Sequence, residues 1–471
     1  MADNHTHPAR EDEATKLSPL ACRAARLARD ARFDGLFYTA VLSTGIYCRP
    51  ICPARAPRED NVRYFPSAAA CAQAGFRPCL RCRPDAAPGT RPASPLVAGA
   101  LGRLDAGAGV GEVSRAAGVS SRYLRQCFND VLGVAPKQYQ LYQRCLLAKQ
   151  LLHQTTWPIT DIAFASGFGS LRRFNDCFKT QLSLTPSQVR RGAPESARAG
   201  TLTLTLAYRP PYNWPWVAQF LQARAIEGLE QASPTHYGRC FQLGDTHAWF
   251  VAEHCGDRCG FTVNLWLSDW HKLTQAVAKI RQILDLDANA RAVDAAVQAA
   301  IGRAPINPGL RLPQFPSAFE AGVRAVLGQQ VSVAAARRLV AQVVAALGEP
   351  MALAVTDAGT ALCFPTPEAV AGHDLAFLKM PGMRRDTLKR LAAFCAAHPD
   401  APVEQWLTLK GIGPWTVDYA RMRGEANLDI WLAGDLGVRH GVAKVGEVVD
   451  GRARPWRSYL TLQMWSQLAD E

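Results

Sequence analysis

The chain has 471 residues, of which 48% are hydrophobic and 20% charged, a composition typical of globular proteins. This length exceeds what one hydrophobic core usually organises and predicts three or four domains. No run approaches the roughly 18 apolar residues of a membrane helix, and the polar N-terminus lacks the pattern of a secretory signal. We therefore expect a cytoplasmic protein with no membrane partner.

Positive charge is concentrated in the front of the chain. Residues 1–200 contain 27 Lys and Arg against 15 Asp and Glu, whereas residues 201–471 contain 26 against 25. A basic front half suits a polyanionic partner such as DNA, although a merely solvated charged surface would look the same. The 14 cysteines, without an export signal, favour metal ligands and buried thiols over disulfides.

Two segments rich in Pro, Gly and Ala, residues 83–95 and 190–200, predict linkers. The expected fold class is multidomain α+β, with a small α/β domain, an all-α domain, an α+β subdomain and an all-α core. The corresponding ranges are 1–88, 92–195, 199–300 and 301–471.

The front domain contains two cysteine pairs. Cys48 and Cys52 are separated by three residues, and Cys79 and Cys82 by two, with Gly and Pro around both pairs. Four thiolates with this spacing suit one tetrahedral zinc ion. From the spacing alone, a purely structural zinc site is the main interpretation.

The surrounding residues STGIYCRPICPARAPREDNVRYF and AGFRPCLRCRPD resemble the N-terminal domain of the Ada methylation-response proteins. The resemblance implies that Cys48 accepts a methyl group from a DNA methylphosphotriester and that Cys52, Cys79 and Cys82 complete the zinc site. A thiolate bound to zinc stays deprotonated and electron-rich. We expect phosphate contacts from nearby arginines, although exposed surface charges are an equal alternative: Arg49, Arg55, Arg58 and Arg63.

The middle of the chain repeats a pattern after about fifty residues. Cys127-Phe128 is followed by Pro136, and Cys177-Phe178 is followed by Pro186, each with a short helix, a Gly turn and a second helix before it. Both copies resemble the helix-turn-helix region of AraC-type regulators. Four arginines are expected to face DNA from recognition helices that start near Ser120 and Gly169: Arg122, Arg125, Arg172 and Arg173.

Apolar residues at helical spacing in these repeats are interpreted as core: Tyr123, Leu124, Phe128, Phe174 and Phe178. The resemblance to transcription regulators adds RNA polymerase as a candidate partner, and we expect a monomer. It does not distinguish an activator from a repressor.

The back half begins with alternation typical of strands, TLTLTLAYRPPY, and becomes helical after residue 315. Its main motif is LKGIGPWT, a glycine-rich turn between two helical stretches that contains Gly411 and Gly413. Backbone amides at such a turn suit a DNA phosphate. On this motif alone, a simple helix-connecting turn is as good an interpretation.

Four ordered segments resemble the AlkA branch of the helix-hairpin-helix glycosylases: YRPPYNWPWVAQFLQARAIEGLE, GLRLPQFPSAFEAGVRAVLGQQVSVAAARRL, KGIGPWTVDYARMRG and PWRSYLTLQMW. The resemblance implies that Asp435 is catalytic and that Trp415, Tyr419 and Trp465 line a base pocket, with packing as the alternative role of these rings. Gln330 stands where some relatives insert leucine into DNA.

Relatives that also cleave the strand use a Schiff-base lysine at the position of Trp415, so no lyase activity is expected. The leading hypothesis is therefore a methylphosphotriester-sensing regulator joined to a DNA-3-methyladenine glycosylase. Two alternatives remain from sequence: a regulator whose back half only binds damage, with Asp435 out of place, and a structural zinc protein with an inert Cys48.

Overall fold

The computed structural model describes residues 17–79, 81–84, 94–190, 201–351 and 361–468. The two predicted linkers lie largely outside the described residues, because residues 85–93 and 191–200 are not among them. The domain limits drawn at those linkers therefore stay predictions. Within the described part of the chain, no helix is both long and apolar enough to cross a membrane.

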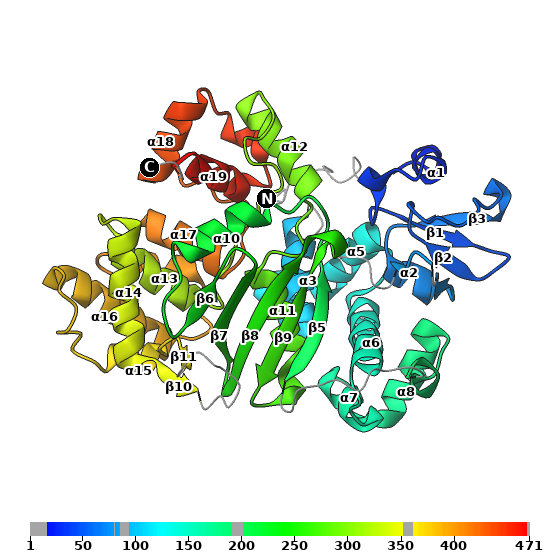
Figure 1. Cartoon of the computed structure of the whole chain (residues 1–471), viewed down its shortest axis with the longest axis horizontal. Coiled ribbons are helices and arrows are strands. Elements are labelled where there is room, and N and C mark those ends of the chain that lie inside the picture. Colours follow the sequence, from blue (N-terminus) through cyan, green and yellow to red (C-terminus); the bar gives the residue numbers. More distant parts are fainter. Residues whose placement is uncertain (1–16, 80, 85–93, 191–200, 352–360, 469–471) are drawn as a thin grey trace, which may run out of the picture.

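The front of the chain forms a small sheet with two helices, at the right of Figure 1. Its strands lie in the order β3-β1-β2-β4, and β2 and β4 are parallel. Its elements are α1 (Pro19–Leu27), η2 (Ala31–Phe33), β1 (Tyr38–Val41), β2 (Ile46–Cys48), η3 (Glu59–Asn61), β3 (Val62–Phe65), α2 (Ala68–Gln73) and β4 (Arg77–Pro78). We call this unit the sulfur domain.

Seven helices follow, and they form two copies of one motif on either side of the long helix α6. They are α3 (Pro95–Asp105), α4 (Val110–Ala116), α5 (Ser121–Leu132), α6 (Pro136–Gln154), α7 (Ile159–Ala165), α8 (Leu171–Leu182) and α9 (Pro186–Val189). Ser120 caps α5 and Ser170 caps α8, close to the starts that the sequence predicts. The first ten residues of α5 and α8 have the same order of buried and exposed positions, as a structural repeat requires.

The predicted core residues Leu124, Phe128, Phe174 and Phe178 are fully buried. Tyr123 is wrong as a core residue, because 51% of it is exposed. The reason is helical geometry: Tyr123 directly precedes the buried Leu124 and therefore points about 100° away from the core-facing stripe.

The next part of the chain is an antiparallel five-stranded sheet with helices packed against it, in the centre of Figure 1. The strand order is β5-β9-β8-β7-β6. The alternation predicted at TLTLTL is confirmed, since Leu202, Leu204 and Leu206 are buried while the threonines between them are exposed. The elements are β5 (Leu202–Ala207), α10 (Trp214–Gln222), β6 (Glu230–Ala232), β7 (His236–Leu243), β8 (Thr246–Cys255), η5 (Gly256–Arg258), β9 (Gly260–Leu267), η6 (Trp270–Lys272), α11 (Leu273–Ile283) and α12 (Ala290–Ile301).

The rest of the chain is mainly helical, as expected, but it also contains a two-stranded sheet of β10 and β11 that the expectation of an all-α core lacks. The predicted boundary after residue 300 falls in the last turn of α12, whose apolar side chains belong to the same core as those of α19. The elements are α13 (Ala318–Gly328), α14 (Val333–Leu347), β10 (Glu349–Met351), β11 (Ala361–Cys363), α15 (Pro367–Ala371), α16 (Gly382–Ala397), η7 (Val403–Thr408), α17 (Pro414–Gly424), α18 (Leu436–Val445), η8 (Asp450–Ala453), α19 (Arg457–Trp465) and η9 (Ser466–Leu468).

One apolar core continues from the second helix-turn-helix into the five-stranded sheet. It joins side chains of α6, α7 and α8 to those of β5, β9 and α11. Trp157 and Trp270 meet across this junction with ring centroids 4.9 Å apart, and Gln150 of α6 donates to the carbonyl of Thr205 at 3.0 Å. The two parts are therefore packed together and not merely tethered.

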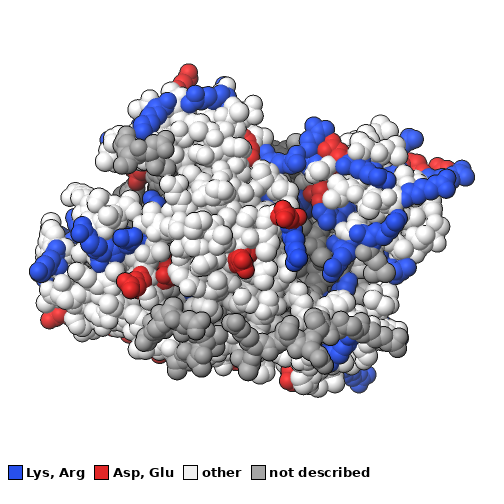
Figure 2. All heavy atoms as spheres, in the orientation of Figure 1, with Lys and Arg blue, Asp and Glu red and all other residues white. Residues whose placement is uncertain are grey.

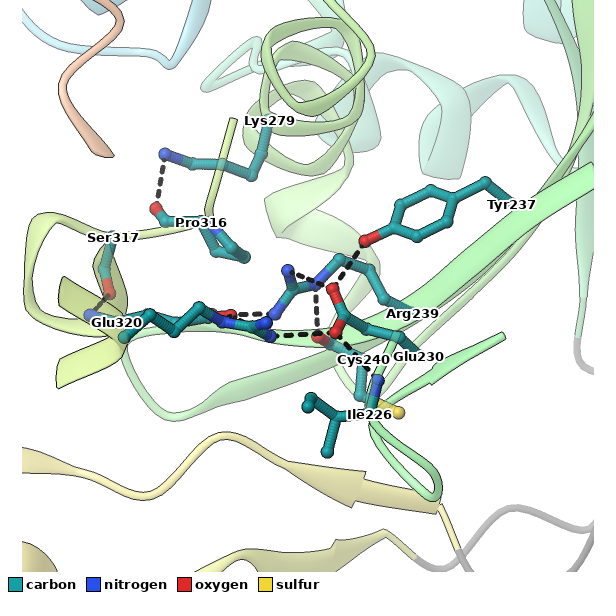
Figure 3. A network of polar contacts seen from close by, with 10 residues as sticks. Ile226, Glu230, Tyr237, Arg239, Cys240, Lys279, Pro316, Ser317 and Glu320 are labelled. Atoms are coloured by element: carbon teal, nitrogen blue, oxygen red, sulfur yellow. Dashed lines mark hydrogen bonds and ion pairs between the residues drawn. The ribbon is translucent and has the colours of Figure 1, made fainter. Parts of the chain in front are cut away.

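A buried ion-pair network fastens the five-stranded sheet to α13 (Figure 3). Arg239 of β7 contacts Glu320 of α13 at 2.7 Å and Glu230 of β6 at 3.3 Å, and Arg324 bonds both carboxylates. The four side chains are at most 9% exposed. Burial alone would raise the pKa of Glu230, but Arg324 and Arg239 hold it below its usual value. The charges of the two guanidinium groups and the two carboxylates thus neutralise one another in a region that water does not reach.

We predict that Glu320→Ala lowers the free energy of unfolding by about 3–5 kcal/mol, because it leaves two buried guanidinium groups with only one carboxylate. Chemical unfolding followed by tryptophan fluorescence measures this loss. The matched control is Glu404→Ala, which removes a half-exposed carboxylate that contacts Arg421 at 2.9 Å and is expected to cost less than about 1 kcal/mol. Equal losses in the two variants would contradict the importance of the network.

Candidate sulfur cluster and glycosylase site

The parallel pairing of β2 and β4 brings the two cysteine pairs together. Tyr47 lies opposite Pro78 in this register, so Cys48 and Cys79 leave the same end of neighbouring strands. The four sulfurs of Cys48, Cys52, Cys79 and Cys82 all lie within 4.8 Å of one another. Tetrahedral Zn–S bonds of about 2.3 Å place sulfurs roughly 3.8 Å apart, so the cluster fits a zinc ion with little rearrangement.

The cluster needs a cation to hold four thiolates. The pKa of Cys48 is raised by its hydrogen bond with Cys82, by burial and by the charges of the other three sulfurs. The Cys82 sulfur also accepts a backbone hydrogen bond of 3.4 Å from the N–H of Arg49. Cys79 and Cys82 are buried, whereas Cys48 and Cys52 are partly exposed.

The arginines expected near the cluster differ in their availability. Arg55 and Arg58 are exposed, but Arg49 donates from both sides of its guanidinium to the carboxylate of Asp34, with Nε 2.9 Å from Oδ1. The carbonyl of Asp34 in turn accepts a hydrogen bond of 2.6 Å from Arg209, which follows β5. Arg49 is therefore held by the protein in this structure.

The expected DNA-facing arginines of the double helix-turn-helix lie on the surface. Arg122 and Arg125 are exposed on α5, and Arg172 and Arg173 are exposed on α8. In the space-filling view of Figure 2, Lys and Arg side chains gather over the sulfur domain and again over the region of α14 and α16. The first gathering accords with the basic front half of the sequence.

The glycine-rich turn lies between η7 and α17. Gly411 has a φ of +96°, and a Cβ atom there would come within 2.1 Å of Thr387 Oγ1, so only glycine fits. Gly413 is the N-cap residue of α17, and Pro414 occupies the first turn. The turn therefore exposes backbone amides at a helix start, which is the geometry of a phosphate site.

The Asp435 carboxylate accepts hydrogen bonds from the backbone and from two indole rings. Its Oδ1 accepts a hydrogen bond from the Val438 N–H at 3.0 Å, so it caps α18. Two indole N–H groups also donate to this carboxylate, Trp465 to Oδ1 at 2.8 Å and Trp415 to Oδ2 at 3.0 Å. The cap and the two indoles fix the orientation of the carboxylate.

The three expected pocket aromatics lie together. Trp415 and Tyr419 are stacked at 5.3 Å with 24° between their planes, and Tyr419 lies 6.3 Å from Trp465. All three rings are partly exposed and lie against the same apolar core. The structure therefore brings Asp435, Trp415, Tyr419 and Trp465 into one site, formed by α17, α18 and α19.

Helix α10 contributes residues that the sequence reasoning missed. Phe220 belongs to the core beneath the aromatic rings, and the guanidinium of Arg423 lies 5.2 Å from Phe220 and 5.9 Å from Tyr419. Arg224 stacks on Phe220 at 3.8 Å. The segment YRPPYNWPWVAQFLQARAIEGLE resembles the glycosylase family, and the helical spacing of its aromatic residues is the sequence signal that could have indicated this contribution.

Gln330 lies in the turn between α13 and α14. It is exposed and has a φ of +57°, and the neighbouring Gln329 donates to Thr416 of α17 at 3.3 Å. The turn that carries Gln330 is thus tied to the helix that follows the glycine-rich turn. The sulfur cluster is not part of this site.

The fold and the two sites define a class of protein: a four-cysteine metal domain and a double helix-turn-helix, joined to a helix-hairpin-helix DNA glycosylase. Family models match in the same order along the chain. The metal binding domain of Ada matches residues 21–85, a helix-turn-helix domain matches residues 113–192, and the AlkA N-terminal domain matches residues 203–317.

A Mycobacterium tuberculosis protein described as "Probable bifunctional transcriptional activator/DNA repair enzyme AlkA" is 37% identical over 488 residues, covering 95% of this chain and 96% of that protein. DNA-3-methyladenine glycosylase 2 of Escherichia coli is 35% identical, covering 55% of this chain and 96% of its own length. The regulatory protein Ada of Salmonella typhimurium is 33% identical, covering 35% of this chain and 47% of that protein. The chain belongs to the family of bifunctional transcriptional activator/DNA repair enzymes AlkA.

Membership in this family and the clustered sulfurs together make the four cysteines a zinc site. We predict that Cys82→Ser lowers the zinc content from about one ion per chain to nearly none, because three sulfurs cannot complete the tetrahedral site. Mass-spectrometric metal analysis of purified protein measures the change. Cys71→Ser, which alters a fully buried cysteine of α2 outside the cluster, is the control and is expected to retain zinc. Full zinc in Cys82→Ser would contradict the site.

Proposed function

We propose that the back half is a monofunctional glycosylase that hydrolyses the N-glycosidic bond of alkylated bases such as 3-methyladenine and 7-methylguanine. The observation that carries the proposal is the Asp435 carboxylate, held between the indole N–H groups of Trp415 and Trp465 beside an exposed glycine-rich turn. A glycosylase needs a carboxylate where the sugar becomes positive and a pocket for the flipped base.

In this proposal each residue has a distinct task. Asp435 stabilises the positive charge that develops on the sugar as the base departs, and it orients the attacking water. Trp415, Tyr419 and Trp465 hold the alkylated purine, whose positive charge is attracted to electron-rich rings. The backbone N–H groups of Gly411 and Gly413 bind a DNA phosphate, and Gln330 enters the space left by the flipped nucleotide.

Asp435→Asn is predicted to lose at least about a hundredfold in base release, equivalent to roughly 3 kcal/mol of transition-state stabilisation. Asparagine is also a good N-cap residue and keeps an oxygen acceptor, so the fold and DNA binding should be retained. Single-turnover release of 3-methyladenine from methylated duplex DNA gives the rate, and thermal unfolding gives the stability.

The control is Asp418→Asn, a half-exposed carboxylate on α17 close to Arg421, for which we expect a rate within about twofold of the unmodified chain. Wild-type release by the Asp435→Asn variant would refute the mechanism. Trp415 occupies the position of the lyase lysine, so the product should be an abasic site that breaks only in alkali. A borohydride-trapped adduct would reject the monofunctional assignment alone.

We infer that the front half senses methylphosphotriesters through Cys48, within the predicted domain of residues 1–88. Zinc, when bound, keeps the four sulfurs deprotonated and nucleophilic. The resemblance to the Ada domain assigns the acceptor to Cys48, which is one of the two partly exposed sulfurs of the cluster. Its sulfur bonds to the methyl carbon, the carbon–oxygen bond breaks, and an ordinary phosphodiester leaves.

Methylation makes Cys48 a thioether and removes one negative charge from a cluster that lies close to DNA, so binding should tighten, most strongly at low salt. Arg55 and Arg58 contact phosphates in this proposal, and Arg49 does so once it leaves Asp34. The arginines of α5 and α8 bind the operator. Two recognition helices in one chain allow a monomer to bind it, and contact with RNA polymerase would complete activation.

We predict that incubation with a methylphosphotriester duplex adds one methyl group to the chain and that peptide mass mapping locates it on Cys48. The methylated chain should bind duplex DNA more tightly than the unmethylated chain, with the larger difference at low salt. Cys71→Ser serves as the matched control and should accept one methyl group as the unmodified chain does. A methyl group mainly on Cys52 would overturn the assignment.

A further inference from the structure

A second thiol pair lies outside both sites, between the long helix α6 and the recognition helix α8. The sulfurs of Cys145 and Cys177 are 3.7 Å apart. Cys145 is fully buried, whereas Cys177 is partly exposed. A buried thiol in contact with a solvent-accessible one is the arrangement of a resolving and an attacking cysteine.

Positive charge surrounds the exposed member of this pair. Arg173 of α8, together with Arg144 and Lys137 of α6, act electrostatically on Cys177. The hydrogen bond from Cys145 and these three cations lower the pKa of Cys177, against the opposing effect of burial. Arg144 is fixed in place by its own hydrogen bond to the Gly167 carbonyl at 2.6 Å. The thiolate, which is the reactive form, is thus favoured at Cys177.

We propose that Cys145 and Cys177 form a redox-active dithiol, which a hydroperoxide converts into a disulfide that weakens operator binding by the second helix-turn-helix. The Cys177 thiolate attacks the O–O bond, giving a sulfenic acid and one molecule of water or alcohol. The Cys145 thiol then attacks the sulfenic sulfur, the S–S bond forms, and water leaves. The sulfurs lose two electrons, and one peroxide is reduced.

The disulfide would change the position of a recognition helix. The sulfurs must approach from 3.7 Å to about 2.05 Å, which draws α8 toward α6. Arg173 lies one helical turn before Cys177 on the same side of α8, so it moves with the cross-link. Base and phosphate contacts depend on such positions, and the DNA-facing arginines of α8 therefore lose their alignment.

The chain offers two internal comparisons. Cys127 holds the position of Cys177 in the first repeat, in a helix with the same burial pattern. Cys240 and Cys363 also lie close enough to interact, but both are at most 1% exposed, so peroxide has no access to either sulfur. The proposal therefore assigns oxidation to the pair of Cys145 and Cys177 and not to the pair of Cys240 and Cys363.

The experiment uses the full, zinc-loaded chain treated with a small excess of hydrogen peroxide. Non-reducing peptide mass mapping should find the Cys145 and Cys177 peptides joined, with the loss of two hydrogens, and a dithiol reductant should restore them. Binding is measured on a 30-base-pair duplex enriched from a random pool by the reduced chain, and we expect oxidation to weaken it at least threefold. Base release from methylated DNA should change less than twofold.

Cys177→Ser is the test variant. Cys177 is partly exposed, so a serine hydroxyl is better tolerated there than at the buried position of Cys145. It should bind the duplex equally before and after peroxide, whereas the control Cys127→Ser should respond as the unmodified chain does. Zinc content is followed in parallel. No cross-linked peptide, a cross-link without loss of binding, or the same loss in Cys177→Ser through zinc release would each overturn the proposal.

Discussion

The arrangement of the glycosylase half depends on the buried charges of Glu230, Arg239, Glu320 and Arg324. Four ionised groups with almost no access to water are tolerated only if their positions satisfy one another, and removal of any one leaves an excess charge in a medium that solvates it poorly. This requirement fixes α13 against β6 and β7. Helix α13 in turn packs so closely on α17 that a Cβ atom on Gly424 would come within 2.5 Å of Ala318 Cα.

The position of α17 then determines how the Asp435 carboxylate is oriented. Trp415 begins that helix and donates to one carboxylate oxygen, while Trp465 at the end of α19 donates to the other. The same carboxylate caps α18. The cap and the two indoles hold the carboxylate in one orientation. In the proposed reaction, a side chain held by three N–H groups does not have to be reorganised when charge develops on a substrate.

Much of this could be predicted from sequence, where the signals are local. Alternating residues define β5, the repeat defines α5 and α8, and the short spacing within each cysteine pair predicts the zinc site. Interactions between distant segments could not be predicted. The pairing of Arg49 with Asp34, the contact of Asp34 with Arg209, and the bond between Arg239 and Glu320, which are 81 positions apart, all depend on how elements meet in space. The prediction that Tyr123 is a core residue was wrong, because helical spacing locates the stripe of apolar residues but does not define how wide its buried part is.

The core shared by α6, α8 and the five-stranded sheet makes the two halves of the chain depend on each other for burial of their apolar surface. Trp157 and Trp270 bury each other across the junction, so a chain shortened to either half would expose aromatic and aliphatic surface and tend to aggregate. An unrelated regulator could not simply replace the front half unless it presented a matching apolar face to β5 and α11. In this chain the front half and the glycosylase half are therefore folded against each other, in a fixed ratio of one to one.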